Sequence, residues 1–180
     1  MSKTCLIVLG LALSGCSGIQ LDAVNPTGVD LSGTWLIDFS ASDEVGDLRN
    51  RLPSKQVRRR DSSVGKEARR IAVGSGLAFV AHDFQVLGAD KLEIELNPDS
   101  MGIQYRPGIY RDVSWGKRQR GLWKVHAGWE ERSLVIVSEA KDLEVIERFV
   151  RSAPNTLQVH VFVEADGDQG EYTRTFKRRL

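Results

Sequence analysis

The stretch Leu157-Gln158-Val159-His160-Val161-Phe162-Val163-Glu164 alternates between two kinds of side chain. Leucine and three valines occupy one parity, and the other parity carries the glutamine, the histidine, the phenylalanine and the glutamate. Successive side chains of a strand point to opposite faces of a sheet. The stretch therefore predicts a β-strand with one apolar, buried face, which ends at the turn residues Asp166-Gly167-Asp168.

Similar short runs make up most of the chain around this stretch. The predicted strands on the two sides of it are Leu31–Phe39, Leu92–Leu96, Gly102–Tyr105, Gly108–Trp115, Gly121–Trp129, Ser133–Ser138, Leu143–Val150 and Glu171–Lys177. In the first run, Leu31, Trp35, Ile37 and Phe39 share one parity and are expected on one buried face. Many short strands separated by turn residues, with few helices between them, favour an antiparallel barrel or sandwich over a βαβ fold.

Closure into a barrel is the preferred architecture, because an open antiparallel sheet of this size has two exposed edges to protect. We therefore expect a mainly β domain over residues 31–180, an antiparallel up-and-down barrel of about eight strands.

Two short motifs resemble those of the lipocalin-like, or calycin, barrels. Gly33-Thr34-Trp35 resembles their Gly-x-Trp, and Tyr172–Phe176 lies where they carry a basic residue on the last strand. The resemblance implies that Trp35 packs across one end of the barrel beneath Arg174 and that both residues are structural. It also implies a lumen able to hold a small lipophilic ligand.

A basic segment interrupts this pattern after the first strand, over about residues 42–80. Ser42 is a candidate helix cap, and Pro53 is a candidate stop. Residues 49–70 carry a net charge of +7, and the candidate contacts for an anionic surface are Arg58, Arg59, Arg60, Lys66, Arg69 and Arg70. Two interpretations stay open: a helical insertion that docks on anionic lipid or an acidic partner, and a solvated helix face.

The first 16 residues have the parts of a secretory signal. Lys3 precedes an apolar run that begins at Cys5, and Leu13-Ser14-Gly15-Cys16 resembles the lipobox of bacterial lipoproteins. The resemblance implies a signal peptide over residues 1–15, acylation of Cys16 and attachment to a membrane through its acyl chains. Residues 16–30 are then expected to be a flexible tether. With Ser17 after the cysteine, it also implies a periplasm-facing outer-membrane location.

Removal of residues 1–15 would leave 24 basic and 24 acidic residues and no cysteine apart from Cys16. A neutral chain gives no indication of nucleic-acid binding, and stability is expected from core packing rather than disulfides. No second apolar run is long enough for a membrane-spanning helix.

We find no catalytic or metal-binding motif. His82, His126 and His160 lack the spacing of metal ligands, and Gly74-Ser75-Gly76 lacks the lysine of a phosphate-binding loop. The carboxylate pairs Glu93/Glu95 and Glu144/Glu147 fit solvated strand faces. We therefore expect that the protein is not an enzyme and that it binds neither a metal nor a cofactor.

Two functions remain from different classes. The first is an envelope lipoprotein whose barrel binds a small hydrophobic molecule or lipid. The alternative is a structural or interaction protein of the envelope whose basic insertion docks an anionic surface or partner.

Overall fold

The computed structural model describes residues 19–44, 83–141, 143–165 and 168–179. Ten strands run through these residues: β1 Gly33–Ile37, β2 Lys91–Leu96, β3 Ser100–Arg106, β4 Tyr110–Ser114, β5 Gly116–Arg120, β6 Trp123–Glu130, β7 Ser133–Ala140, β8 Leu143–Ala153, β9 Thr156–Ala165 and β10 Asp168–Arg178. Two short 3-10 helices accompany them, η1 (Phe39–Ala41) and η3 (Gln85–Leu87).

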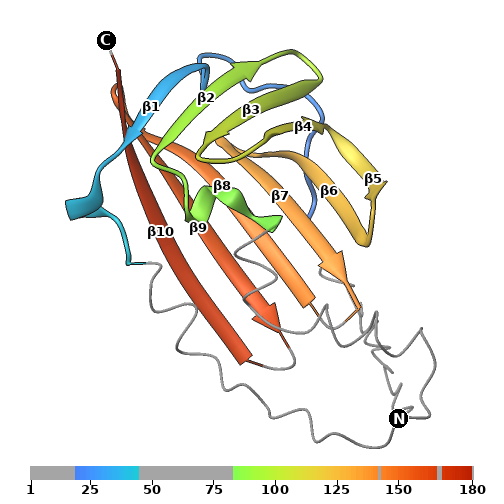
Figure 1. Ribbon diagram of the computed structural model, residues 1–180. Helices are drawn as coiled ribbons and strands as arrows, with labels where there is room; N and C mark the ends of the chain where they lie inside the picture. The colour runs from blue at the N-terminus through green and yellow to red at the C-terminus, as the bar shows by residue number, and fades with distance from the viewer. Residues whose placement is uncertain (1–18, 45–82, 142, 166–167, 180) are drawn as a thin grey trace, which may run out of the picture.

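All ten strands belong to one antiparallel sheet that curls into a nearly closed barrel (Figure 1). Strands that are consecutive in the chain pair with each other except for β4 and β5, and β1 pairs with β10, so the two outer strands of the sheet are β4 and β5. These two strands are consecutive in the chain, and β4 also approaches β6. The prediction of a mainly β, antiparallel up-and-down barrel is confirmed.

The number of strands is ten rather than about eight. The additional strand β5 contains Lys117, Arg118, Gln119 and Arg120, all exposed, so it has no apolar face to reveal it in the sequence. Phe39 also differs from the expectation. The first strand ends at Ile37, and the chain then turns outward into η1, which leaves Phe39 68% exposed.

The inward side chains of the strands form one hydrophobic core. On β9, Leu157 and the three following valines of the same parity are all essentially buried, as the alternating sequence predicts. Register places them beside inward residues of β8 and β10, such as Phe149 opposite Val159 and Phe176 opposite Leu157. The apolar period of two therefore produces both the sheet and its packed interior.

Three tryptophans close one end of the barrel, and all three indole nitrogens have hydrogen-bond acceptors. Trp35 Nε1 donates to the Leu31 carbonyl at 2.9 Å. Trp115 and Trp129 both donate to Asn25 Oδ1, at 3.0 and 2.8 Å, and their rings meet edge to face with centroids 6.0 Å apart. Buried indoles with satisfied N–H groups make this end a solid plug.

The segment before β1, which we expected to be a tether, lies against the barrel within its described part. Asp22 forms a two-way backbone bridge with Trp129, with both N···O distances at 2.8 Å. A side chain at Gly128 would collide with the Asp22 carbonyl, since a Cβ there would lie 2.6 Å from that oxygen. Gly128 thus allows the segment to cross β6 at close range.

The opposite end of the barrel is where the described chain breaks between Glu44 and Asp83. The Ser42 side chain donates to the Asp38 carbonyl and accepts from the Thr175 backbone N–H, so this residue joins η1 to β10. The basic insertion, including Arg58, Arg59, Arg60, Lys66, Arg69 and Arg70, lies outside the described residues. So do residues 1–18, which contain the signal and Cys16.

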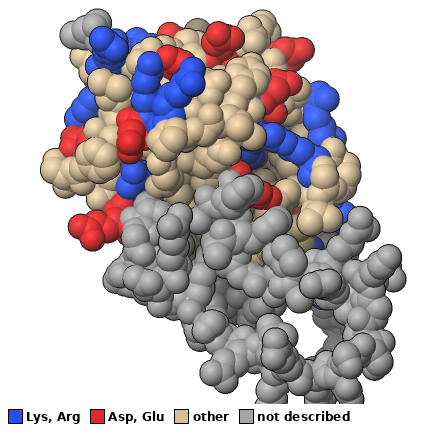
Figure 2. Space-filling model, in the orientation of Figure 1, with Lys and Arg blue, Asp and Glu red and all other residues tan. Residues whose placement is uncertain are grey.

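Charges of both signs are intermixed on the described surface in the view of Figure 2. Across the described residues, none of the helices has the length and apolar character needed to cross a bilayer.

Candidate functional site

The gap between β4 and β5 is spanned on the inside by Phe84, which precedes η3. Its ring packs edge to face on Trp123 of β6 with centroids 5.1 Å apart. The Arg111 guanidinium of β4 lies 5.7 Å from the centre of the same ring. Two hydrogen bonds hold the segment, from Trp123 Nε1 to Asp83 Oδ2 at 2.8 Å and from the Ile109 N–H to Gln85 Oε1 at 2.7 Å. Phe84 is therefore a fixed wedge between the two edges of the barrel.

A hollow of about 250 Å³ opens beside this wedge. Its inner lining comes from inward residues of three strands, Arg111, Val125 and Ser138, and its aromatic walls are Phe84 and Trp123. Its rim comes from the two hairpins that flank the gap and includes Ile109, 62% exposed, and Leu122, 70% exposed. The hollow thus joins an apolar mouth to a polar floor inside the barrel.

Arg111 in the floor forms a buried ion pair with Glu147, which lies behind it and does not itself line the hollow. Arg111 Nη1 lies 2.5 Å from Glu147 Oε2 of β8, and the two residues are 7% and 0% exposed. Both sit at inward positions of their strands, alternating with apolar residues. Burial by itself lowers the pKa of Arg111, but the adjacent Glu147 carboxylate outweighs it and the pKa is raised. Arg111 is therefore charged, and the Glu147 carboxyl is its counter-charge in the interior of the barrel.

Three buried polar side-chain atoms in this part of the core, one of them an oxygen of Glu147 itself, have no well-formed hydrogen bond in the described part of the chain. They are Tyr105 Oη, Ser138 Oγ and Glu147 Oε1. Tyr105 and Ser138 are each 1% exposed. Burial raises the pKa of the Tyr105 hydroxyl, and the Arg111 charge opposes this rise only in part, so the phenol is neutral. Buried polar atoms are normally satisfied, so this cluster is unusual within the core.

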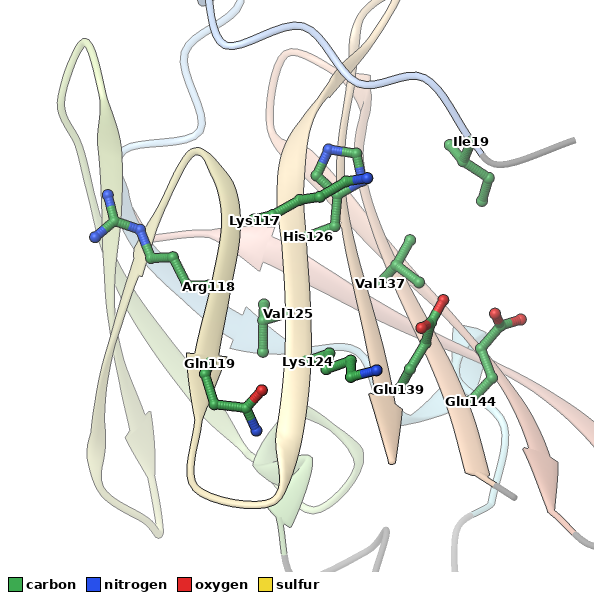
Figure 3. A pocket seen from close by; sticks show the side chains of 10 residues that line it. All are labelled: Ile19, Lys117, Arg118, Gln119, Lys124, Val125, His126, Val137, Glu139 and Glu144. Atoms are coloured by element: carbon green, nitrogen blue, oxygen red, sulfur yellow. The ribbon is translucent and has the colours of Figure 1, made fainter. Parts of the chain in front are cut away.

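A second, larger hollow of about 710 Å³ lies along the outside of β5, β6 and β7 (Figure 3). It is lined on the outer face by Lys117, Lys124, His126, Val137 and Glu139, with Glu144 of β8 and Ile19 at its margins. Val137 belongs to this outer face, because it alternates with the inward residues of β7 and lies outside the core cluster.

The two ends of this outer hollow differ in charge, because Lys117 and His126 lie at one end and Glu139 and Glu144 at the other. Burial and the nearby Lys117 lower the pKa of His126. At the other end, burial together with the carboxylates of Glu139 and Glu164 raises the pKa of Glu144. These three glutamates form a row across β7, β8 and β9 because Glu144 is paired in register with both of the others. The polar side chains here are partly solvated, unlike those of the inner hollow.

The tryptophan of Gly33-Thr34-Trp35 closes a barrel end, but the cation above it is Arg178. The Arg178 guanidinium lies 5.1 Å from the Trp35 ring centre, and the two residues are register partners on β10 and β1. Arg174 lies two inward positions earlier on β10, opposite Val159, and donates from Nη1 to the Asp43 carbonyl at 2.9 Å. Burial lowers the pKa of Arg174, with Asp90 and Asp43 opposing. Strand register therefore assigns the stacking role to Arg178.

The histidines are not brought together within the described residues. His160 is exposed on the outer face of β9, where Nδ1 lies 3.1 Å from Thr173 Oγ1. His126 lines the outer hollow, and His82 lies outside the described residues. No group of three potential metal ligands occurs in the described ranges.

The two carboxylate pairs have different environments. Glu93 is solvated and forms an ion pair with Lys91 at 2.6 Å, and Glu95 is exposed, in accord with the expectation. Glu144 and Glu147 lie on opposite faces of β8, and Glu147 is completely buried rather than solvated. The two glutamates are three positions apart, and an odd spacing on a strand places two side chains on different faces.

Sequence reasoning missed Arg111 and Glu147, although both carry a detectable signal. In Leu143-Glu144-Val145-Ile146-Glu147-Arg148-Phe149, the inward parity carries leucine, valine, glutamate and phenylalanine. Arg111 likewise shares its parity with Val113 and Trp115. A charged residue that alternates with the apolar, inward-facing residues of a strand indicates a buried ion pair or a binding site.

No protein-family model matches the chain, and no curated protein matches it either. Among solved structures, the wild-type fluorescent protein UnaG is similar, with a TM-score of 0.50 and 15% sequence identity over 83% of this chain and 97% of that one. A point mutant of the same protein gives a TM-score of 0.49 and 17% identity over 83% and 96% of the two chains. The wild-type likeness supports the fold, an antiparallel β-barrel, and the described chain has ten strands.

Proposed function

We propose that this barrel binds a small, mainly hydrophobic molecule in the hollow beside Phe84. The observation that supports it best is the combination of an apolar, exposed mouth with buried polar atoms that lack partners in the described chain. An engineered cavity of about 150 Å³ is known to hold benzene, so a hollow of about 250 Å³ has room for one aromatic ring with a short substituent. The barrel resembles a solved calycin-type structure, and eight-stranded and larger barrels can hold such ligands.

The location of the hollow supports entry from outside. Ile109 and Leu122 lie on the two hairpins at the rim, and the other barrel end is plugged by Trp35, Trp115 and Trp129. A ligand that entered between the hairpins would exchange contact with water for contact with Phe84 and Trp123. Burial of apolar surface contributes about 25 cal/mol per Å².

Native mass spectrometry of the protein purified from its own host tests this function, and we expect a co-purifying small molecule. Val125→Phe fills the floor of the hollow and is expected to abolish that adduct. Lys124→Phe is the matched control, because it places the same ring one residue away on the opposite face of β6. Absence of any adduct, together with no binding of small aromatic probes by the wild type, would refute the function.

We also propose that the protein is a lipoprotein, acylated at Cys16 and attached to the outer membrane on its periplasmic side. The support is the sequence Leu13-Ser14-Gly15-Cys16 with its preceding apolar run. Two or more acyl chains would anchor the protein stably, whereas one binds only marginally. The intact mass of the membrane-extracted protein tests the proposal. A mass that retains residues 1–15 or lacks acyl chains would contradict it.

The alternative function is an interaction protein whose basic segment docks an anionic surface. It is supported by the +7 charge of residues 49–70. Charge reversal at Arg58, Arg59 and Arg60 should then abolish binding to anionic vesicles without lowering Tm. Unchanged vesicle binding would remove this function.

A further inference from the structure

The ion pair in the floor of the hollow constrains the chemistry of a ligand. Arg111 and Glu147 are both nine-tenths buried or more, and their charges cancel at a separation of 2.5 Å. A single buried arginine would attract a carboxylate ligand. With Glu147 already in contact, a ligand anion would gain one cation and at the same time face one buried anion.

The free positions around the pair point to a hydrogen-bond donor. Glu147 Oε2 is occupied by Arg111, whereas Oε1 accepts from no group in the described part of the chain. An ionised carboxylate oxygen can only accept. Ser138 Oγ and Tyr105 Oη, also unpartnered there, can each donate or accept. A ligand hydroxyl or N–H group would complement this set, because it can donate to an oxygen and, as a hydroxyl, also accept.

We infer that the hollow selects uncharged ligands that carry a hydroxyl or N–H group on a compact apolar body, and that it discriminates against carboxylates. The inference rests on the proposed function, since it assigns a ligand class to the same hollow. Ser138 lines the hollow directly, and Arg111 connects it to Glu147 and Tyr105. The walls of Phe84 and Trp123 suit a flat apolar body, and aromatic rings commonly pack edge to face on such side chains.

Three probes of matched skeleton test the selection. 2-Phenylethanol carries the hydroxyl, phenylacetate carries a carboxylate, and ethylbenzene carries neither group. Binding to the full-length protein is followed by NMR titration of the Trp123 indole N–H. We expect 2-phenylethanol to bind at least about 3-fold tighter than ethylbenzene, because one net hydrogen bond contributes about that factor. We expect it to bind at least about 10-fold tighter than phenylacetate, because burial of a charge without net compensation is costly.

Two variants connect the selection to named atoms. Ser138→Ala should weaken 2-phenylethanol about 3- to 10-fold and leave ethylbenzene unchanged. Ser133→Ala on the same strand, at the plugged end, is the matched control and should change neither. Glu147→Gln leaves the arginine charge uncompensated, so phenylacetate should bind better than 2-phenylethanol. If Glu147→Gln does not fold, Ser138→Ala with the wild-type ranking still decides the question.

The outcomes separate the two levels of the proposal. Binding of ethylbenzene or phenylacetate as tightly as 2-phenylethanol would overturn the ligand class while leaving a binding function in place. Failure of all three probes to bind, with no co-purified molecule in native mass spectrometry, would overturn the proposed function itself. The expected ranking, together with its reversal in Glu147→Gln, would support both.

Discussion

Removal of one member of the buried Arg111–Glu147 pair should destabilise the barrel far more than removal of both. In Glu147→Leu, a guanidinium that is 7% exposed loses its counter-charge and cannot release its proton. Breaking a buried pair in this way costs about 3–5 kcal/mol. For a domain of this size each kcal/mol lowers Tm by about 2–4 °C, so we expect a decrease of about 6–20 °C.

The reverse single variant, Arg111→Met, leaves a fully buried carboxyl without its counter-charge and should lose a similar amount of stability. The double variant Arg111→Met/Glu147→Leu should lie within about 1 kcal/mol of the wild type or above it.

Urea unfolding followed by tryptophan fluorescence measures all four proteins in a double-mutant cycle. The reasoning is refuted if both single variants cost less than about 1 kcal/mol, or if the double variant costs as much as the two singles together. Recovery of stability in the double variant distinguishes an unpaired guanidinium from a simple packing defect.

Three further outcomes follow from the structure. Arg178→Gln removes the cation above Trp35 and should lower the free energy of unfolding, measured with urea, by about 0.5–1 kcal/mol. In a Trp35→Phe background, Arg178→Gln should lower it by less. Glu144→Gln should raise Tm at neutral pH, because the pKa of Glu144 is raised and its ionised form is the unfavourable one in the folded protein. The gain in Tm should vanish below about pH 4, where the carboxyl is protonated in both states. A gain in Tm that does not change with pH would contradict this assignment. Lys117→Gln should raise the pKa of His126 as measured by NMR titration, since Lys117 lowers it; an unchanged pKa would leave burial as the sole cause.

Most of the strands were predictable because their apolar residues alternate without interruption. Leu92–Leu96 and the stretch from Leu157 show this pattern, and both are strands with the expected buried face. β5 escaped prediction because an exposed edge strand needs no apolar face, and Gly116–Arg120 has none. Local sequence therefore reveals a strand only where the strand has to bury something.

The candidate site was much harder to predict, because it depends on register between strands that are far apart in the chain. Arg111 and Glu147 are separated by 36 positions, and Tyr105 and Ser138 come from two further strands. Each residue alone shows that a polar side chain stands at an inward position of its strand, but not which partner it meets. The pairing of Arg178 with Trp35 has the same origin, since a shift of register by four residues on β10 would have placed Arg174 there instead.

The two ends of the barrel differ in how completely their polar groups are satisfied, and the proposed binding site lies at the less satisfied end. At the plugged end, Asn25 accepts from two indoles and donates to the Asn97 carbonyl, so its amide is used on both sides. At the other end, the described chain leaves Ser138 Oγ and Glu147 Oε1 unpartnered beside a hollow. An unsatisfied buried polar group costs about 1–3 kcal/mol, so a fold gains nothing by keeping two of them for stability alone. A bound hydroxyl or N–H group would recover that cost, which makes ligand binding the simplest physical reason for a polar floor in an otherwise apolar barrel.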